Sequence, residues 1–155
     1  MADASTPLPE LLAEDSIRLD ATAADRDDAI RHAGQALLDA GAIEPSYIDA
    51  MLERENSVST YVGEGVAIPH GTDESREHIK RAALAFLQFP EGVDWNGKTA
   101  QVCIAIASRS DEHIGILQSL AMVLSDKEKA QRLRETTRVD EVLELLAPTD
   151  DDEDD

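Results

Sequence analysis

Four histidines are the side chains of this sequence best suited to chemistry near neutral pH, because imidazole changes its charge there. His70 stands between Pro69 and Gly71, directly after the apolar segment 66–68. Proline fixes the backbone torsion φ, and glycine lets backbone approach a ligand closely. Reactive groups are commonly held on such loops at the edge of a rigid scaffold. These features leave two interpretations of His70 open, a functional histidine and an ordinary packed one.

His113 follows the polar segment 109–112 and is expected at the start of a helix. The first helical turn offers unpaired N–H groups and the positive end of the helix dipole, which favour a neutral imidazole or a bound anion. Taken alone, this position is more typical of a capping-region residue than of a functional one. His32 lies in a helical pattern and His78 in a charged stretch, and both are expected to be solvated or partly packed.

No spacing in the sequence points to a metal or a nucleotide, so no cofactor is expected. His-x-x-x-His and Cys-x-x-Cys pairs are absent. The single cysteine, Cys103, cannot form an internal disulfide, and its apolar surroundings predict a buried, inert thiol. P-loop and Gly-x-Gly-x-x-Gly motifs are absent as well. No Gly-x-Ser-x-Gly elbow exists, although composition alone leaves a Ser-His-Asp triad open.

The elements that position these residues fit into one domain of 155 residues and 16.8 kDa. A formal net charge of -19 excludes a general nucleic-acid binder and argues against anionic membrane surfaces. No apolar run approaches the roughly 20 residues of a membrane span. The first residues lack the basic and apolar regions of a signal peptide. A cytoplasmic protein without direct membrane insertion is therefore expected.

The acidic residues are dispersed along the whole chain. The sequence has 33 Asp and Glu against 14 Lys and Arg, and only four of these cations are lysines. Few lysines together with dispersed acids are typical of a surface adapted to molar salt, where the Debye length falls to about 3 Å and self-repulsion is screened. The sequence therefore predicts a halophilic protein.

Two helices are expected in the N-terminal part, after a short strand over 17–19. Thr22 and Asp25 resemble a capping box, with apolar residues at helical spacing after them and Gly41 as the stop. The second helix is expected over 44–56, with proline in its first turn.

Short apolar strands are expected in the middle of the chain and three helices at its end. The polar stretch 57–65 is predicted as a loop, and 72–80 as turns or one short helix. The predicted strands cover 66–68, 82–89 (ended by 90–92) and 102–107, the last buried on both faces, with an Asn96-Gly97 turn before it. The predicted helices cover 113–124, 127–134 and 139–146.

Together these elements predict an α/β fold with a small mixed β-sheet flanked by helices. The expected organisation is a flexible N-terminus over 1–9, one domain over 10–147 and a disordered acidic tail over 148–155.

Seven segments of the chain match the pattern of a known family: 53–55, 59–63, 65–72 (with Pro69-His70-Gly71-Thr72), 90–93, 106–109, 111–114 and 137–143. Through these segments the chain resembles enzyme IIA of the mannitol/fructose class, the phosphocarrier domains of the sugar phosphotransferase system (PTS), over about residues 10–147. The mannitol-type members are most similar.

The resemblance implies a phosphocarrier in which His70 is phosphorylated. HPr would donate the phosphoryl group from its own histidine, and a cysteine of enzyme IIB would accept it, with IIC at the membrane involved indirectly. His113 matches a second active-site histidine that hydrogen-bonds the phosphoryl oxygens, and Arg54 matches the active-site arginine. Thr60, Thr72 and Gly71 are weaker candidates for donors. The sugar is expected to be fructose first, or mannitol, and no metal or other cofactor is required.

Several alternatives remain open from the residues. Without the resemblance, Arg54 would be expected to pair with Glu53 or Glu55. Glu64 stands where many members have Asn and would be unfavourable near a phosphorylated site unless it points away. A regulatory, nitrogen-type enzyme IIA would carry the phosphoryl group on the same histidine but act through partner binding. A binding module or small hydrolase without phosphotransfer is the third reading, and the joint presence of Arg54, His70 and His113 weighs against it.

Overall fold

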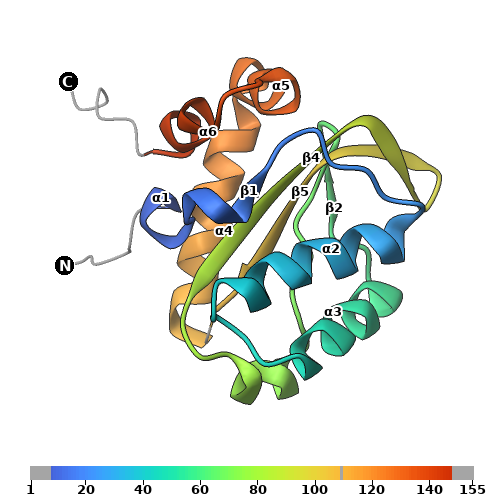
Figure 1. Cartoon of the computed structure of the whole chain (residues 1–155), viewed down its shortest axis with the longest axis vertical. Helices are drawn as coiled ribbons and strands as arrows, with labels where there is room; N and C mark the ends of the chain where they lie inside the picture. The colour runs from blue at the N-terminus through green and yellow to red at the C-terminus, as the bar shows by residue number, and fades with distance from the viewer. Residues whose placement is uncertain (1–7, 109, 148–155) are drawn as a thin grey trace.

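The computed structural model describes residues 8–108 and 110–147, with the backbone alone described for Asp73 and for residues 110–112 (Figure 1). Helices form at both ends of the described chain and strands between them. The helices are α1 (Leu8–Leu11), α2 (Arg26–Asp39), α3 (Ser46–Ser57), α4 (Ser110–Ser125), α5 (Lys127–Glu135) and α6 (Val139–Leu146), with short 3₁₀ helices η1 (Glu14–Ser16) and η2 (Asp73–His78). The strands are β1 (Ile17–Arg18), β2 (Tyr61–Gly63), β3 (Val66–Ala67), β4 (Ala83–Trp95) and β5 (Lys98–Ala107).

The five strands form one mixed sheet in the order β1-β4-β5-β3-β2. β1 pairs parallel with β4, and β3 pairs parallel with β5, whereas the β4–β5 and β3–β2 pairs are antiparallel. Asn96 and Gly97, at φ 56 and 91, close the β4–β5 hairpin as the sequence predicts. The expected mixed sheet flanked by helices is confirmed.

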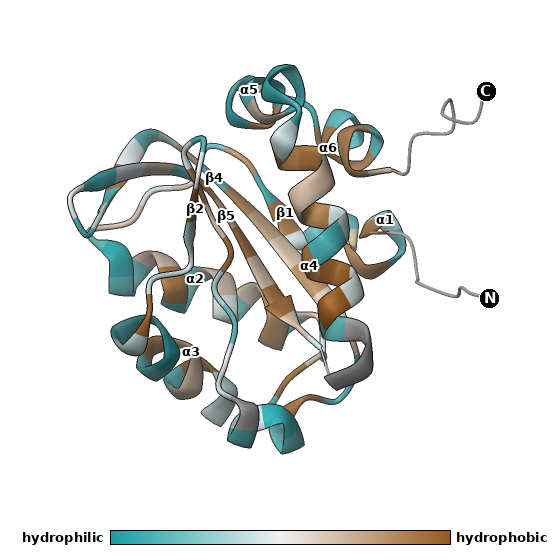
Figure 2. Cartoon of the chain, turned by 180° about the vertical axis from the view of Figure 1, so that it is seen from behind, coloured by the Kyte–Doolittle hydropathy of each residue, from teal (hydrophilic) through white to brown (hydrophobic). Residues whose placement is uncertain are grey.

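Helices cover both faces of this sheet (Figures 1 and 2). Along β5 the side chains of 102–107 are fully buried and alternate between two apolar clusters. The odd-numbered residues face α2 and α3, and the even-numbered ones face α1, α4, α5 and α6. The predicted burial of this strand on both faces is confirmed, and the unbroken apolar run follows from it.

Several elements differ from the sequence prediction, among them β5 and α4, which begin earlier than expected, at Lys98 and Ser110. Leu8 is only 3% exposed and begins α1, so the folded part starts before residue 10. Asp25 is the N-cap of α2 in place of Thr22, because its carboxylate accepts the backbone N–H of Asp28. Residues 61–63, predicted as loop, form β2. β4 runs on through 90–92 because a bulge absorbs this Pro-Glu-Gly segment. The predicted disorder of 148–155 and flexibility of 1–7 lie outside the described residues.

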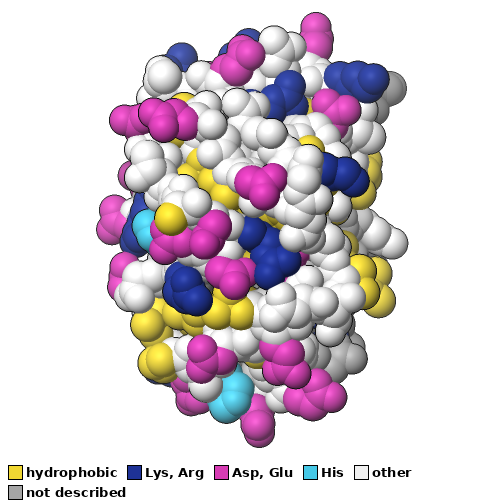
Figure 3. All heavy atoms as spheres, turned by 90° about the vertical axis from the view of Figure 1, so that its right-hand side faces the viewer, with side chains coloured by type: hydrophobic (Ala, Val, Ile, Leu, Met, Phe, Trp, Pro, Cys, Tyr) yellow, Lys and Arg dark blue, Asp and Glu magenta, His cyan; other side chains and the backbone are white. Residues whose placement is uncertain are grey.

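On the face of the molecule seen in Figure 3, acidic side chains lie at many separate places rather than in one patch. We expect the far-ultraviolet circular dichroism of the protein to fade as salt is lowered from the molar range, because unscreened repulsion at a net charge of -19 destabilises the compact state. An unchanged spectrum in dilute buffer would contradict the halophile prediction. Among the described residues, no helix has the length and apolar character needed to span a bilayer.

Candidate active site around His70

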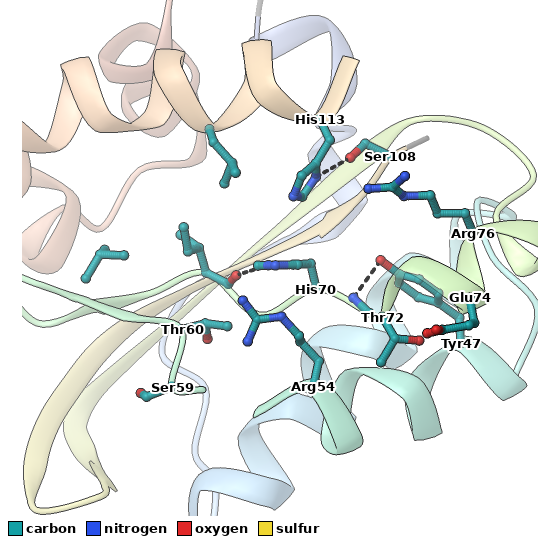
Figure 4. Close-up of a pocket in the computed structure, with 14 residues that line it drawn as sticks. Tyr47, Arg54, Ser59, Thr60, His70, Thr72, Glu74, Arg76, Ser108 and His113 are labelled. Carbon is teal, nitrogen blue, oxygen red and sulfur yellow. Dashed lines mark hydrogen bonds between the residues drawn. The ribbon is translucent and has the colours of Figure 1, made fainter. Parts of the chain in front are cut away.

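His70, His113, Arg54 and Arg76 converge on a cavity of about 620 Å³ (Figure 4). The cavity lies where the parallel strands β3 and β5 end, because His70 follows β3 and pairs with Ile106 of β5 through an isolated bridge. α3 carries Arg54 in its last turn, η2 carries Arg76, and α4 carries His113 in its first turn. The predicted site residues His70, His113 and Arg54 therefore meet at one cavity, and Arg76, which was not predicted, lines it with them.

The geometry of His70 fixes which ring nitrogen can react. Its Nδ1 lies 2.9 Å from the carbonyl oxygen of Ile68. A carbonyl only accepts hydrogen bonds, so Nδ1 carries the proton and Nε2 keeps its lone pair. Burial lowers the pKa of His70, the hydrogen bond to Ile68 opposes that shift, and the positive charge of Arg54 adds to it. A neutral imidazole with a free Nε2 is the form required of a nucleophile.

This lowered pKa predicts the pH dependence of His70 reactivity. Protonation removes the lone pair of Nε2, so reactivity is lost only as the pH falls through a pKa below the ordinary 6.5. We expect an NMR titration to place the pKa of His70 below 6.5 in the wild type and to raise it in Arg54→Gln, which lacks the nearby positive charge. A pKa at or above 6.5 in the wild type would contradict the electrostatic picture.

His113 faces His70 across the cavity. The two ring centroids are 4.9 Å apart, with an interplanar angle of 59°. Nδ1 of His113 lies 2.7 Å from Oγ of Ser108, the residue directly after β5. His113 is thus positioned by a buried hydroxyl as well as by its helix, and sequence reasoning did not single out Ser108.

Arg54 is held by the backbone rather than by an acid. Its Nη1 donates to the carbonyl of Val58 at 2.7 Å, which fixes the guanidinium at the cavity wall. The alternative ion pair with Glu53 or Glu55 is not formed among the described residues. Arg76 also lines the cavity, and like Arg54 it lowers the pKa of His70. Two guanidinium groups beside an imidazole favour a tetrahedral anion.

Glu55 is committed to a buried hydrogen-bond network that includes Thr60. Its carboxylate accepts the backbone N–H and the hydroxyl of Thr60, at 2.8 and 2.6 Å, and the indole N–H of Trp95 at 2.8 Å. Glu55 is 2% exposed and Thr60 is 5% exposed. Thr60 was predicted to offer a hydroxyl or backbone donor to the site, but both its hydroxyl and its N–H are directed at Glu55.

Gly71 serves a different purpose from the one predicted. Its N–H donates to the hydroxyl of Tyr47 at 2.9 Å, and this hydroxyl donates to the carbonyl of Ile106 at 2.9 Å. A Cβ at Gly71 would lie 2.5 Å from both the Tyr47 ring and Oγ of Ser75. Gly71 therefore makes room for Tyr47, and its N–H is not offered to a ligand. Burial raises the pKa of Tyr47 to about 12, which keeps the hydroxyl protonated.

The other polar and titratable residues considered from the sequence are Thr72, Cys103, His32 and His78. Thr72 lines the cavity. Its carbonyl accepts a hydrogen bond from the hydroxyl of Ser75, and the role of its own hydroxyl as a donor to the site stays a prediction. Cys103 is fully buried, and burial raises its pKa far above the ordinary range, as expected of an inert thiol. His32 contacts Asp28, and His78 contacts Glu44, both at the surface.

The carboxylate of Glu64 lies outside the cavity around His70 and close to Arg134. Its carbonyl accepts Nη1 of Arg134 at 2.7 Å, and its carboxylate lies 3.7 Å from the same guanidinium, which belongs to α5. Glu64 is absent from the cavity wall around His70. The condition stated for tolerating this carboxylate, that it points away, is met.

Comparisons with known proteins agree on one family. Residues 10–148 match the family described as the phosphoenolpyruvate-dependent sugar phosphotransferase system, EIIA 2. The chain is 38% identical over 143 residues to the mannitol-specific phosphotransferase enzyme IIA component of Staphylococcus aureus (strain Mu50 / ATCC 700699), covering 92% of this chain and 99% of that protein. It is 45% identical over 148 residues to the mannitol-specific EIICBA component of Escherichia coli (strain K12), covering 94% of this chain but 23% of that longer protein.

Solved structures show the same fold. The crystal structure of IIA mannitol from Escherichia coli superimposes with a TM-score of 0.81 at 44% identity, over 87% of this chain and 98% of that one. A complex of enzyme IIA and phosphorylated enzyme IIB of the mannitol system from the same organism gives 0.80 at 44% identity, over 86% and 94%. With its family match, its sheet and its histidine-lined cavity, the chain belongs to the EIIA 2 family of the phosphoenolpyruvate-dependent sugar phosphotransferase system and is a phosphotransferase component of it.

Proposed function

We propose that this protein is a phosphocarrier that accepts a phosphoryl group on Nε2 of His70 and passes it to a cysteine of an enzyme IIB. The observation that carries this proposal is the hydrogen bond from Nδ1 of His70 to the Ile68 carbonyl, which leaves the Nε2 lone pair for the cavity. The guanidinium groups of Arg54 and Arg76 lie at the same cavity, where a transferred phosphoryl group would bring negative charge.

In the first transfer, the phosphorus–nitrogen bond of a donor phosphohistidine breaks and a new one forms to Nε2 of His70. The donor imidazole leaves with the electron pair and becomes neutral. The His70 ring gains a positive charge, which the Ile68 carbonyl stabilises at Nδ1. Charge spreads over three equatorial oxygens in the in-line transition state. The presence of Arg54, Arg76 and His113 in the cavity wall supports a role for them in stabilising that charge. The donor we propose is HPr.

In the second transfer, a cysteine thiolate of enzyme IIB attacks the phosphorus atom. The bond to Nε2 breaks, its electron pair returns to the ring, and His70 is neutral again. The printed description of the matching Escherichia coli complex, enzyme IIA with phosphorylated enzyme IIB, supports this choice of acceptor. Exposed Val62 at the cavity and Ile114 one residue after His113 provide apolar contact area of the kind that a short-lived docking requires.

We place mannitol before fructose as the sugar of the system, with IIC involved only through IIB. The matching relatives from Staphylococcus aureus and Escherichia coli are described as mannitol-specific, which reverses the order expected from the sequence. A role as a regulatory enzyme IIA takes second place. The nitrogen regulatory protein IIA-Ntr of Neisseria meningitidis shares the fold at a TM-score of 0.74 but only 26% identity.

The proposal is tested by following the phosphoryl group. The protein is incubated in high salt with phosphoenolpyruvate, enzyme I and HPr from its own source, and its intact mass and acid lability are recorded. Purified IIB proteins of a mannitol and a fructose system are then added. We expect an acid-labile adduct of one phosphoryl group that moves to the mannitol IIB. If HPr becomes phosphorylated but this protein gains no adduct, the phosphocarrier function is refuted. If the phosphoryl group moves to the fructose IIB alone, the choice of mannitol is refuted.

A further inference from the structure

The two facing histidines of the cavity are held by different hydrogen-bond partners. Nδ1 of His70 faces a backbone carbonyl, whereas Nδ1 of His113 faces the hydroxyl of Ser108. We propose that Ser108 is a positioning residue that holds His113 in its Nε2–H tautomer, opposite to that of His70, so that His113 presents a hydrogen-bond donor to the transferred phosphoryl group. This inference rests on the proposed phosphocarrier function.

The burial of Ser108 determines the direction of its hydrogen bond. Ser108 is 4% exposed, and its Oγ lies 2.7 Å from Nδ1 of His113. A buried hydroxyl directs its proton to an acceptor, and Nδ1 of His113 is the acceptor within reach of this Oγ among the side chains that the structure describes, which do not include those of residues 110–112. Ser108 therefore donates to Nδ1. In a neutral imidazole with Nδ1 as acceptor, the proton resides on Nε2.

Opposite tautomers suit two rings that face one cavity. His70 turns a lone pair toward it and His113 turns an N–H toward it, with the ring centroids 4.9 Å apart. Once Nε2 of His70 carries a phosphoryl group, the anionic oxygens face a donor on His113. The other tautomer of His113 would face them with a lone pair and repel them. A neutral donor also binds the group less tightly than a third cation would, which favours onward transfer.

The tautomers can be measured directly in the wild-type protein. At about pH 8, where neutral imidazole prevails, ¹⁵N-resolved NMR of the histidine rings reports which nitrogen is protonated. We expect Nδ1–H for His70 and Nε2–H for His113. A finding of Nδ1–H for His113 would overturn the inference, whether or not the protein proves to be a phosphocarrier.

Variants link the tautomer to transfer. We expect Ser108→Ala to slow transfer from phosphorylated protein to IIB about tenfold, the effect of losing one oriented hydrogen bond, and Ser108→Thr to restore it. His113→Gln, whose amide N–H replaces Nε2–H, should retain more activity than His113→Asn. Ser16→Ala, at an equally buried serine in η1, is the matched control. An unchanged transfer rate and tautomer in Ser108→Ala would overturn the inference while leaving phosphoryl acceptance by His70 intact.

Discussion

Replacement of His70 by alanine is expected to abolish phosphoryl acceptance. Its Nε2 is the imidazole lone pair directed at the cavity, since its Nδ1 is engaged with the Ile68 carbonyl and His113 is held with its own Nδ1 toward Ser108. Removal of a nucleophile lowers turnover by more than about 10⁴-fold in enzymes where it has been tested. Acceptance is measured as the acid-labile mass adduct formed with phosphoenolpyruvate, enzyme I and HPr.

The fold of this variant should survive, because one hydrogen bond to Ile68 is worth roughly 1 kcal/mol. His78→Ala is the matched control. It removes an imidazole that contacts Glu44 at the surface and lies in η2, just after the site. We expect it to accept the phosphoryl group at the wild-type rate. An adduct of normal yield on His70→Ala would move the phosphorylation site elsewhere and refute the mechanism.

Local sequence patterns were sufficient to predict most of the elements around this site. The apolar run 102–107 predicts a strand buried on both faces, because every side chain along it must then be apolar, and β5 is such a strand. Helical spacing predicts α2, α3, α5 and α6 nearly to their ends. The sequence does not predict β2, because the segment 57–65 has the polar, glycine-containing composition of a loop. In the structure the glycines serve the turn from β2 to β3, where residues 63–65 all have positive φ.

Sequence reasoning about the site failed where a side chain depends on a partner that is distant in the chain. Tyr47 has the spacing of a core residue of α3, yet its hydroxyl bonds Ile106 and Gly71, and neither bond leaves a local signal. Ser108 and Arg76 lie in polar stretches where most residues are solvated. Only the meeting of α4 and η2 at the end of β5 gives these two residues a role at His70.

Glu55 shows how much the site depends on one buried carboxylate. It receives three hydrogen bonds, two from Thr60 just before β2 and one from Trp95 at the end of β4, and it follows Arg54 directly in α3. The same charge raises the pKa of His70 against the effects of burial and Arg54. Glu55 thus links α3 to the segments at β2 and β4 through hydrogen bonds, and it influences the pKa of His70 through its charge.

Glu55→Leu is therefore expected to lower the free energy of unfolding by about 3 to 5 kcal/mol, because three buried donors lose their acceptor. That is a large part of the 5 to 15 kcal/mol typical of a domain, so partial unfolding at moderate temperature follows. The measurement is urea denaturation at constant high salt, followed by tryptophan fluorescence of Trp95.

Two variants separate the network from the mere loss of an acid. Glu53→Leu removes the exposed neighbouring carboxylate and should change stability by less than about 0.5 kcal/mol. Glu55→Gln keeps an acceptor for Trp95 and for the N–H of Thr60, while its amide can donate to the Thr60 hydroxyl oxygen, so most of the stability should remain. Equal losses in Glu55→Gln and Glu55→Leu would show that the charge of the carboxylate, and not its geometry as an acceptor, stabilises the wall behind Arg54.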